Sequence, residues 1–273
     1  MVALREHMQE RYADWRADLP PNSRWPAFCT ECAPLNFEVI PDDFQIADDA
    51  LVWPGRRNTP HDDAPERAHI CGAFDGIEPE GVRVVVLGQD PYPVVESATG
   101  RAFEDGTPDA AGKAVRPALR TLGQSALDLY GAACPQGFCH GLAGRAETIR
   151  ARFDLLAQQG VLCLNASWTY SDDAHQPAHQ ELWRPVTASI LCRLAEREAG
   201  PPVFLLLGTE AQNFFNALHL GAIPNAAVVR KCHPTERRNR YFAGSNPLQQ
   251  VNDTLGHLGN DPITWWPPVV PAA

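Results

Sequence analysis

The sequence has no apolar run long enough to span a bilayer, and residues 1–7 lack the apolar core of a signal peptide. It shows no internal repeat and no low-complexity segment, so nothing indicates a repeat protein. These absences predict a soluble intracellular protein that acts in the cytoplasm and does not contact a membrane.

The sequence also has few cysteines and histidines at the spacing that metal ligands show. Of the eight cysteines, Cys29 and Cys32 have the spacing of a metal-binding pair, and Cys134 and Cys139 form a looser pair. No pair of histidines accompanies them, and cysteines in apolar segments, such as Cys163, behave as small hydrophobic residues. We therefore expect no metal site.

The sequence also has no excess of basic over acidic residues. The chain has 23 Lys and Arg against 33 Asp and Glu, a formal net charge of −10. This argues against broad nonspecific binding to nucleic acid, but it does not exclude a local basic site. Residues 230–240 hold five Lys or Arg, which form either a solvated charged turn or a patch that binds phosphates.

The 273 residues, 44% of them hydrophobic, suit one large domain with an extension. Apolar residues at helical spacing predict a helix over 1–20, which Pro20 and Pro21 end. Residues 21–80 predict a wrapping arm with one or two short helices. We divide the chain into an N-terminal helical extension (1–50), a catalytic domain (51–260) and a tail (261–273).

From residue 82 the pattern alternates between strands and helices. Short β-branched and apolar runs predict buried strands at 82–87, 161–164, 203–207 and 226–229. The segments between and after them predict helices at 116–130, 146–159, 187–198, 210–218 and 247–258. This alternation predicts an α/β fold, with a central parallel four-stranded sheet and helices on both faces.

Polar residues lie within four positions of the ends of three of these strands, namely Asp90, Asn165 and His233. The carboxyl ends of parallel strands lie along one edge, so these side chains are expected to converge there. Alone, Asp90 is as well explained by a turn that it caps, and Asn165 by a helix cap. Three such residues at one edge favour a functional site.

The motifs around these residues resemble the uracil-DNA glycosylases, the family 1 type most of all. That family's first motif, Gly-Gln-Asp-Pro-Tyr-His, reads Gly-Gln-Asp-Pro-Tyr-Pro at 88–93, and Phe103 follows Tyr92 by eleven residues as in the family. Asn165 ends a Leu-Cys-Leu-Asn segment, and the signature His-Pro-Ser-Pro-Leu reads His-Pro-Thr-Glu-Arg at 233–237. The resemblance runs from about residue 50 to about residue 258, with the motifs in the family's order.

The resemblance implies how a flipped uracil would be bound. Phe103 would stack on the base, the Asn165 amide would read it, and Tyr92 would exclude the methyl group of thymine. Asp90 would stabilise the sugar cation and orient water. His233 and the backbone N–H groups of Gln89 and Asp90 would stabilise the leaving uracil. No cofactor is implied.

The resemblance also implies a DNA-binding surface, and four departures from the family's pattern bear on the site or on that surface. Pro93 replaces a His, Thr235 replaces a Ser, Ala118 stands in place of a phosphate-binding Ser, and Arg237 replaces the Leu that fills the gap left by the flipped base. We hypothesise that Arg237 makes the protein hold the abasic product tightly. The residues expected to contact DNA are Arg116, Pro117, Thr235, Arg237, Arg238 and Arg240.

We therefore predict a monomeric, monofunctional uracil-DNA glycosylase of base-excision repair. Its partners would be single- and double-stranded DNA containing uracil, and free uracil would be a product. Two alternatives stay open: a glycosylase of the same fold for hypoxanthine, thymine or another base, and a noncatalytic module that binds abasic or damaged DNA.

Overall fold

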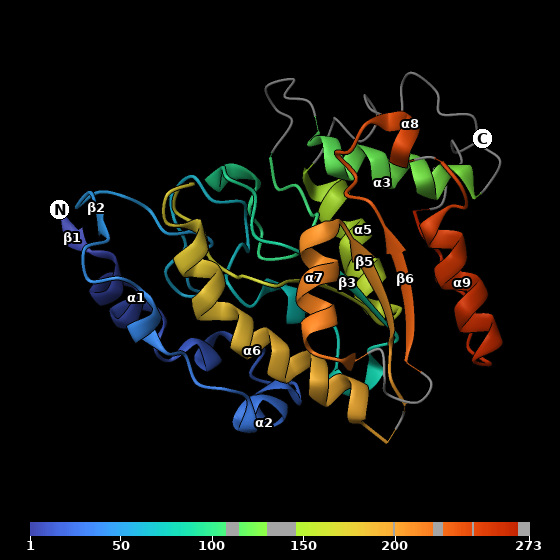
Figure 1. The fold of residues 1–273 in the computed structure, drawn as a ribbon, viewed down its shortest axis with the longest axis horizontal. Coiled ribbons are helices and arrows are strands. Elements are labelled where there is room, and N and C mark those ends of the chain that lie inside the picture. The colour runs from blue at the N-terminus through green and yellow to red at the C-terminus, as the bar shows by residue number, and fades with distance from the viewer. Residues whose placement is uncertain (108–114, 130–145, 199, 221–225, 242, 267–273) are drawn as a thin grey trace.

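A four-stranded parallel sheet forms the centre of the molecule (Figure 1). The computed structural model describes residues 1–107, 115–129, 146–198, 200–220, 226–241 and 243–266. The strands are β3 (Val84–Gly88), β4 (Val161–Asn165), β5 (Val203–Leu207) and β6 (Ala227–Lys231), in the order β4-β3-β5-β6. The predicted α/β fold is confirmed.

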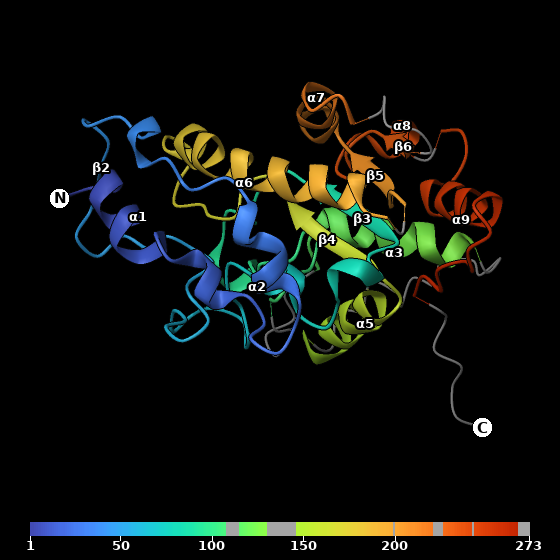
Figure 2. The ribbon, with the colours of Figure 1, turned by 90° about the horizontal axis from the view of Figure 1, so that it is seen from below.

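Successive residues of each strand point to opposite faces of the sheet. Because both faces are buried, the strands are continuous apolar runs in the sequence. The longer helices are α1 (Leu4–Tyr12), α3 (Pro117–Asp128), α5 (Ala146–Gln158), α6 (Gln176–Glu196), α7 (Thr209–Ala217) and α9 (Pro247–His257). Val85 and Leu87 pack with α6 and α7, whereas Val84 and Val86 pack with α3, α5 and α9. Figure 2 shows α6 and α5 on opposite sides of the sheet.

The predicted helix 187–198 was wrong at its start, because α6 begins at Gln176 and runs through Pro185. Proline ends many helices because it lacks an N–H and crowds the preceding turn. Pro185 lies on the exposed face of α6, where water can satisfy the carbonyl that loses its helical partner, and Leu182 and Val186 around it are buried. Burial of the helix's apolar face therefore outweighs the break in its hydrogen-bond ladder.

The N-terminal residues pack into the same apolar core as one face of the sheet. Trp15 contacts Trp168 edge to face, with ring centroids 5.0 Å apart, and Trp168 stacks on Trp183 of α6 at 4.8 Å. Arg56 forms an ion pair with the buried Asp18. The predicted continuous helix over 1–20 is interrupted: α1 ends at Tyr12 and a 3-10 helix (Trp15–Asp18) follows.

Shorter elements complete the fold. β1 (Val2–Ala3) and β2 (Gln45–Ile46) pair antiparallel, and two four-residue helices, α2 (Trp25–Phe28) and α8 (Arg238–Tyr241), lie in the arm and after β6. None of the helices in the described ranges has the length and apolarity that crossing a membrane requires.

Candidate functional site

A cavity of about 380 Å³ lies at the carboxyl edge of the sheet, beyond the ends of β3, β4 and β6. Segments far apart in the chain meet there because parallel strands end at the same edge. The site residues expected from the sequence that line this cavity are Gln89, Asp90, Tyr92, Phe103, Arg116, Pro117, Asn165, His233 and Thr235.

Asn165 and Gly88 lie opposite each other, as the last paired residues of β4 and β3. A Cβ atom on Gly88 would come within 2.4 Å of Asn165 Oδ1 and 2.9 Å of the Ala102 Cβ. Asn165 is buried, and its side-chain amide forms no hydrogen bond with another residue in the described ranges. The amide therefore has both a donor and an acceptor available for a ligand.

Aromatic side chains make one wall of the cavity. Phe103 has a φ of 66°, a left-handed conformation that is uncommon outside glycine, and its ring centroid lies 6.1 Å from that of His233. The Tyr92 hydroxyl donates to the Phe103 carbonyl at 3.3 Å, and Trp53 Nε1 donates to the Tyr92 carbonyl at 2.9 Å. These two hydrogen bonds fix the position of Tyr92 and tie its side chain to the backbone of Phe103.

Asp90 supplies the carboxylate of the cavity. Burial raises its pKa, whereas hydrogen bonds from Gln176 and Gln180 and the charge of Arg184 lower the pKa. Gln176 Nε2 donates directly to Asp90 Oδ2, and Gln89 Nε2 lies 3.4 Å from the same oxygen. The carboxylate is thus held in one orientation while it stays at the cavity surface.

The contacts and the burial of His233 favour one protonation state of its imidazole ring. The backbone N–H of Thr235 donates to His233 Nδ1 at 3.2 Å, so Nδ1 is an acceptor and Nε2 carries the proton of the neutral ring. Burial lowers the pKa of His233, and the charge of Glu236 opposes this. The ring is therefore neutral at pH 7 and can donate from Nε2.

Arg116, Pro117 and Thr235 lie among the residues that line the cavity. Arg116 Nε donates to Ser97 Oγ at 2.9 Å, and its guanidinium lies 5.9 Å from the centroid of the Tyr92 ring. Pro117 begins α3. A positive charge beside the aromatic wall is thus fixed by the protein's own contacts.

The structure does not bring every expected residue to the cavity. Arg237 and Arg240 are exposed on the segment after Thr235, and Arg240 Nη1 lies 3.6 Å from Glu236 Oε2. The side chain of Arg238 lies outside the described part of the structure. Cys29 and Cys32 are buried in the arm, and Cys134 and Cys139 belong to residues that the structure does not describe.

The sequence analysis missed five polar residues that line the cavity, namely Thr99, Arg101, Tyr170, Asp173 and Gln176. The signal that identifies Gln176 is the helix spacing of Gln176, Gln180 and Arg184, which places their side chains on one face. The expectation that α6 starts at residue 187 hid this pattern.

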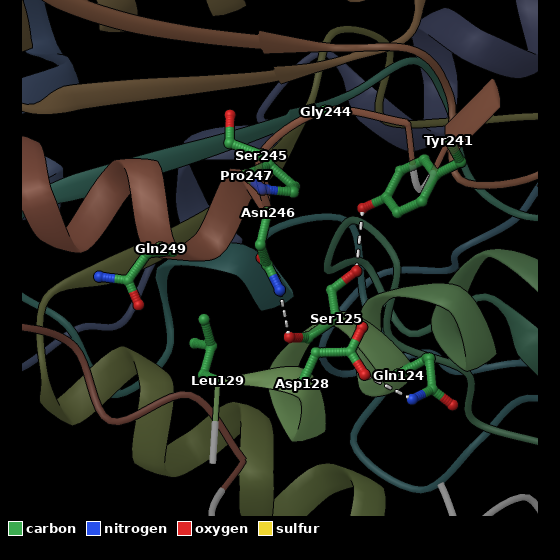
Figure 3. A pocket seen from close by; sticks show the side chains of 10 residues that line it. All are labelled: Gln124, Ser125, Asp128, Leu129, Tyr241, Gly244, Ser245, Asn246, Pro247 and Gln249. Carbon is green, nitrogen blue, oxygen red and sulfur yellow. Dashed lines mark hydrogen bonds between the residues drawn. The ribbon is translucent and has the colours of Figure 1, made fainter. Parts of the chain in front are cut away.

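A second cavity, of about 840 Å³, lies between α3, α8 and α9, and the described residues that line it include none of the expected site residues (Figure 3). Asn246 Nδ2 donates to the Ser125 carbonyl at 2.6 Å, and Gln124 Nε2 donates to Asp128 Oδ1 at 2.8 Å. Size therefore does not identify the candidate site here. The smaller cavity combines a carboxylate, a neutral imidazole and an unpaired amide.

Comparisons with known proteins identify the family to which the sequence is related. The sequence profile of the uracil DNA glycosylase superfamily matches residues 74–256. A uracil-DNA glycosylase of Lactobacillus delbrueckii subsp. bulgaricus is 32% identical over 212 residues, covering 77% of this chain and 83% of that protein. One from Bordetella petrii is 32% identical over 230 residues, covering 81% and 76%.

Two solved structures share the fold. The wild-type UNG structure from Nitratifractor salsuginis aligns with a TM-score of 0.58 at 20% identity, covering 94% of this chain and 96% of that one. A mimivirus uracil-DNA glycosylase aligns with a TM-score of 0.53 at 16% identity, covering 71% of each chain.

Proposed function

The chain belongs to the uracil-DNA glycosylase superfamily, and we propose that the cavity at the carboxyl edge of its sheet is the active site. The protein is a monofunctional uracil-DNA glycosylase, a hydrolase of N-glycosyl bonds that acts in base-excision repair. One observation supports this assignment of the site above all: Asp90, Asn165 and His233, from three strand ends, line one cavity.

The cavity is suited to binding a uracil that has been flipped out of the DNA stack. The free amide of Asn165 can donate to uracil O4 and accept from N3–H, a pattern that cytosine reverses. Phe103 offers its ring for stacking, and Tyr92 would stand against C5, where the methyl group of thymine would clash. Recognition would thus combine hydrogen bonding with steric exclusion.

Asp90 and His233 are suited to cleaving the glycosidic bond. When the bond between C1′ and N1 breaks, its electron pair stays on the base and the sugar becomes positively charged. Asp90 would stabilise that cation and orient the water whose oxygen bonds to C1′, and the proton that this water loses would neutralise the departing uracil anion. His233 would donate from Nε2 to uracil O2 as negative charge develops there, and donors of this kind contribute about 10²–10³ in rate.

DNA would approach the site across its rim. Arg116, Pro117 and Thr235 lie at the cavity, and Arg237, Arg238 and Arg240 follow on the segment after β6. Local basic residues allow phosphate binding in spite of the net charge of −10. We expect this surface to accept both single- and double-stranded DNA.

The remaining proposals concern the molecule's setting. We propose that the protein acts as a monomer, releases free uracil and works in the cytoplasm, where bacterial chromosomal DNA lies. We also propose that residues 51–260 form the catalytic domain, preceded by an extension over 1–50 and followed by a tail over 261–273.

The test uses end-labelled oligonucleotides, single-stranded and duplex, that carry uracil, hypoxanthine or a T:G mismatch. Alkali then cleaves any abasic site, so strand scission reports base removal. We expect scission on uracil substrates, and its loss in Asp90→Asn and His233→Ala. Scission only on hypoxanthine or T:G would indicate another base specificity, and binding without scission would indicate a noncatalytic module.

A further inference from the structure

The carboxylate of Asp90 meets a stripe of polar side chains on α6. Gln176, Gln180 and Arg184 recur at intervals of four residues, so they project from one face of the helix. Pro93, by contrast, lies two residues past the Pro91 that follows Asp90, is exposed, and has no polar side chain to offer. Apart from the neighbouring Gln89, the polar partners of Asp90 come from α6, and the first of them, Gln176, lies 86 residues further along the chain.

The stripe is a chain of hydrogen bonds that ends on the carboxylate. Arg184 Nη2 donates to Gln180 Oε1 at 3.1 Å, which leaves the NH₂ group of Gln180 as a donor. Gln180 in turn contributes a hydrogen bond to Asp90. Gln176 Nε2 donates to Asp90 Oδ2. A positive charge at one end thus orients the amide donors toward the negative charge at the other.

We propose that Gln176, supported by Gln180 and Arg184, is a positioning residue for the reaction: it keeps the Asp90 carboxylate ionised and oriented toward the attacking water. This inference rests on the proposed function of the site. Gln176 acts through Asp90, because its amide donates to the carboxylate oxygen. A donor that binds the charged form favours ionisation, whereas burial in the cavity opposes it.

Other charged and titratable groups face Asp90 as well. The charge of Asp173 raises the pKa of Asp90, and that of Arg184 lowers it. Tyr170 and His233 line the same cavity, and the Tyr170 hydroxyl donates to Asp173 Oδ1. Because Asp173 is exposed and bound to Tyr170, its effect stays the same when Gln176 is replaced.

The test compares Gln176→Met, which keeps the side chain's length and removes the donor, with Gln176→Glu, which places a second carboxylate beside Asp90. Gln249→Met is the matched control, because Gln249 Nε2 donates to Asp253 Oδ1 at 2.7 Å on the exposed face of α9. Single-turnover uracil release from a single-stranded oligonucleotide is measured from pH 4.5 to 9. Binding to abasic DNA and thermal unfolding are measured alongside.

Gln176→Met is expected to slow uracil release about 10- to 100-fold, the usual effect of losing a hydrogen bond to a charged group. The acid limb of its pH profile moves to higher pH, because Asp90 then ionises less readily. Gln176→Glu moves that limb further still. Abasic-DNA affinity stays unchanged, and Gln249→Met matches the wild type.

An acid limb that stays in place in both Gln176 variants would overturn the inference, even if the rate fell, because a merely structural defect lowers the rate at every pH. A wild-type rate in Gln176→Met would overturn it too. These outcomes leave the proposed function intact if the wild-type protein releases uracil. If the wild type releases none from any DNA, the proposed function fails and the inference fails with it.

Discussion

Two glycines determine where the side chains of the site stand. Gly88 leaves room for the Asn165 amide directly beside it in the sheet, and Gly208, with a φ of 101°, lies where a Cβ would come within 3.1 Å of the His233 Cβ. Each glycine thus permits a polar group to lie close against the backbone of a neighbouring strand end. The absence of a Cβ atom at Gly88 and at Gly208 therefore helps to shape the cavity.

Gly88→Ala is predicted to disable the site. The new methyl group would displace Asn165, and errors of about 1 Å in position can lower a rate about 10²-fold. The free energy of unfolding should fall by about 1–3 kcal/mol from overpacking. Uracil release and urea denaturation measure the two effects.

Gly81→Ala is the matched control, because a Cβ there meets no heavy atom within 4 Å. We expect it to release uracil at the wild-type rate. If Gly88→Ala did the same, the close approach of Gly88 to Asn165 would not matter for recognition.

The protonation states of Asp90 and His233 predict the pH profile. Burial raises the pKa of Asp90 above its ordinary value of 3.8, so the carboxylate that we propose to be catalytic is protonated as pH falls through that raised pKa. Burial lowers the pKa of His233 below 6.5, so the ring stays neutral throughout the neutral range. Uracil release per enzyme, measured from pH 4.5 to 9, should therefore be level near pH 6.5 and decline only in more acidic buffer. A break centred at 6.5 would show that His233 titrates as an exposed histidine does.

At the scale of elements, the ends of β3, β4 and β6 place the side chains that we propose to be catalytic, and α6 contacts one of them, Asp90, through Gln176. The exposed segment after Thr235 carries Arg237 at the place where the resemblance expects an inserted Leu. A long basic side chain can fill a gap with its stem while its guanidinium binds acceptors on DNA. This segment is thus the element most suited to holding the product.

Arg237→Leu is predicted to weaken binding to DNA with an abasic site and to speed product release. Losing one phosphate or base contact should reduce affinity about tenfold. The slope of log affinity against log salt concentration should become shallower by about one. Fluorescence anisotropy with abasic duplexes at several salt concentrations measures both.

The matched control is Arg24→Leu, which removes the same charge from an exposed position in the arm, where Arg24 pairs with Glu80. It should leave abasic-DNA affinity unchanged. Equal affinities in the wild type and Arg237→Leu would refute the role of Arg237 in product retention.

At the scale of the whole molecule, the N-terminal arm and the sheet share one apolar core. Trp15 of the arm contacts both Trp168, in the loop after β4, and Trp183 of α6. That loop leads directly to Gln176 at the start of α6. The packing of the arm therefore supports the side of the cavity that Gln176 lines.

Trp15→Ala is predicted to lower the free energy of unfolding by about 3–5 kcal/mol, because a fully buried aromatic ring is replaced by a cavity. Urea denaturation measures the loss. Leu155→Ala is the control: this leucine is 54% exposed on α5, and its removal should change stability by less than about 0.5 kcal/mol. A loss in Trp15→Ala no larger than that of the control would show that the arm does not stabilise the core.

The sequence alone determined the sheet, because each strand is a short apolar run buried on both faces and so is visible locally. It also singled out Asp90, Asn165 and His233, since each lies within four positions of the end of such a run. Their roles in uracil removal stay predictions that the variants above test.

The extent of α6, and the identity of the side chains that reach Asp90, depend on how the chain packs in three dimensions. Pro185 is a local signal for a helix end, but packing of Leu182 and Val186 in the core outweighs it. The bond from Gln176 to Asp90 joins residues 86 positions apart, and no local pattern specifies such a pair. It forms because the sheet and α6 pack together, and that packing is a property of the whole chain.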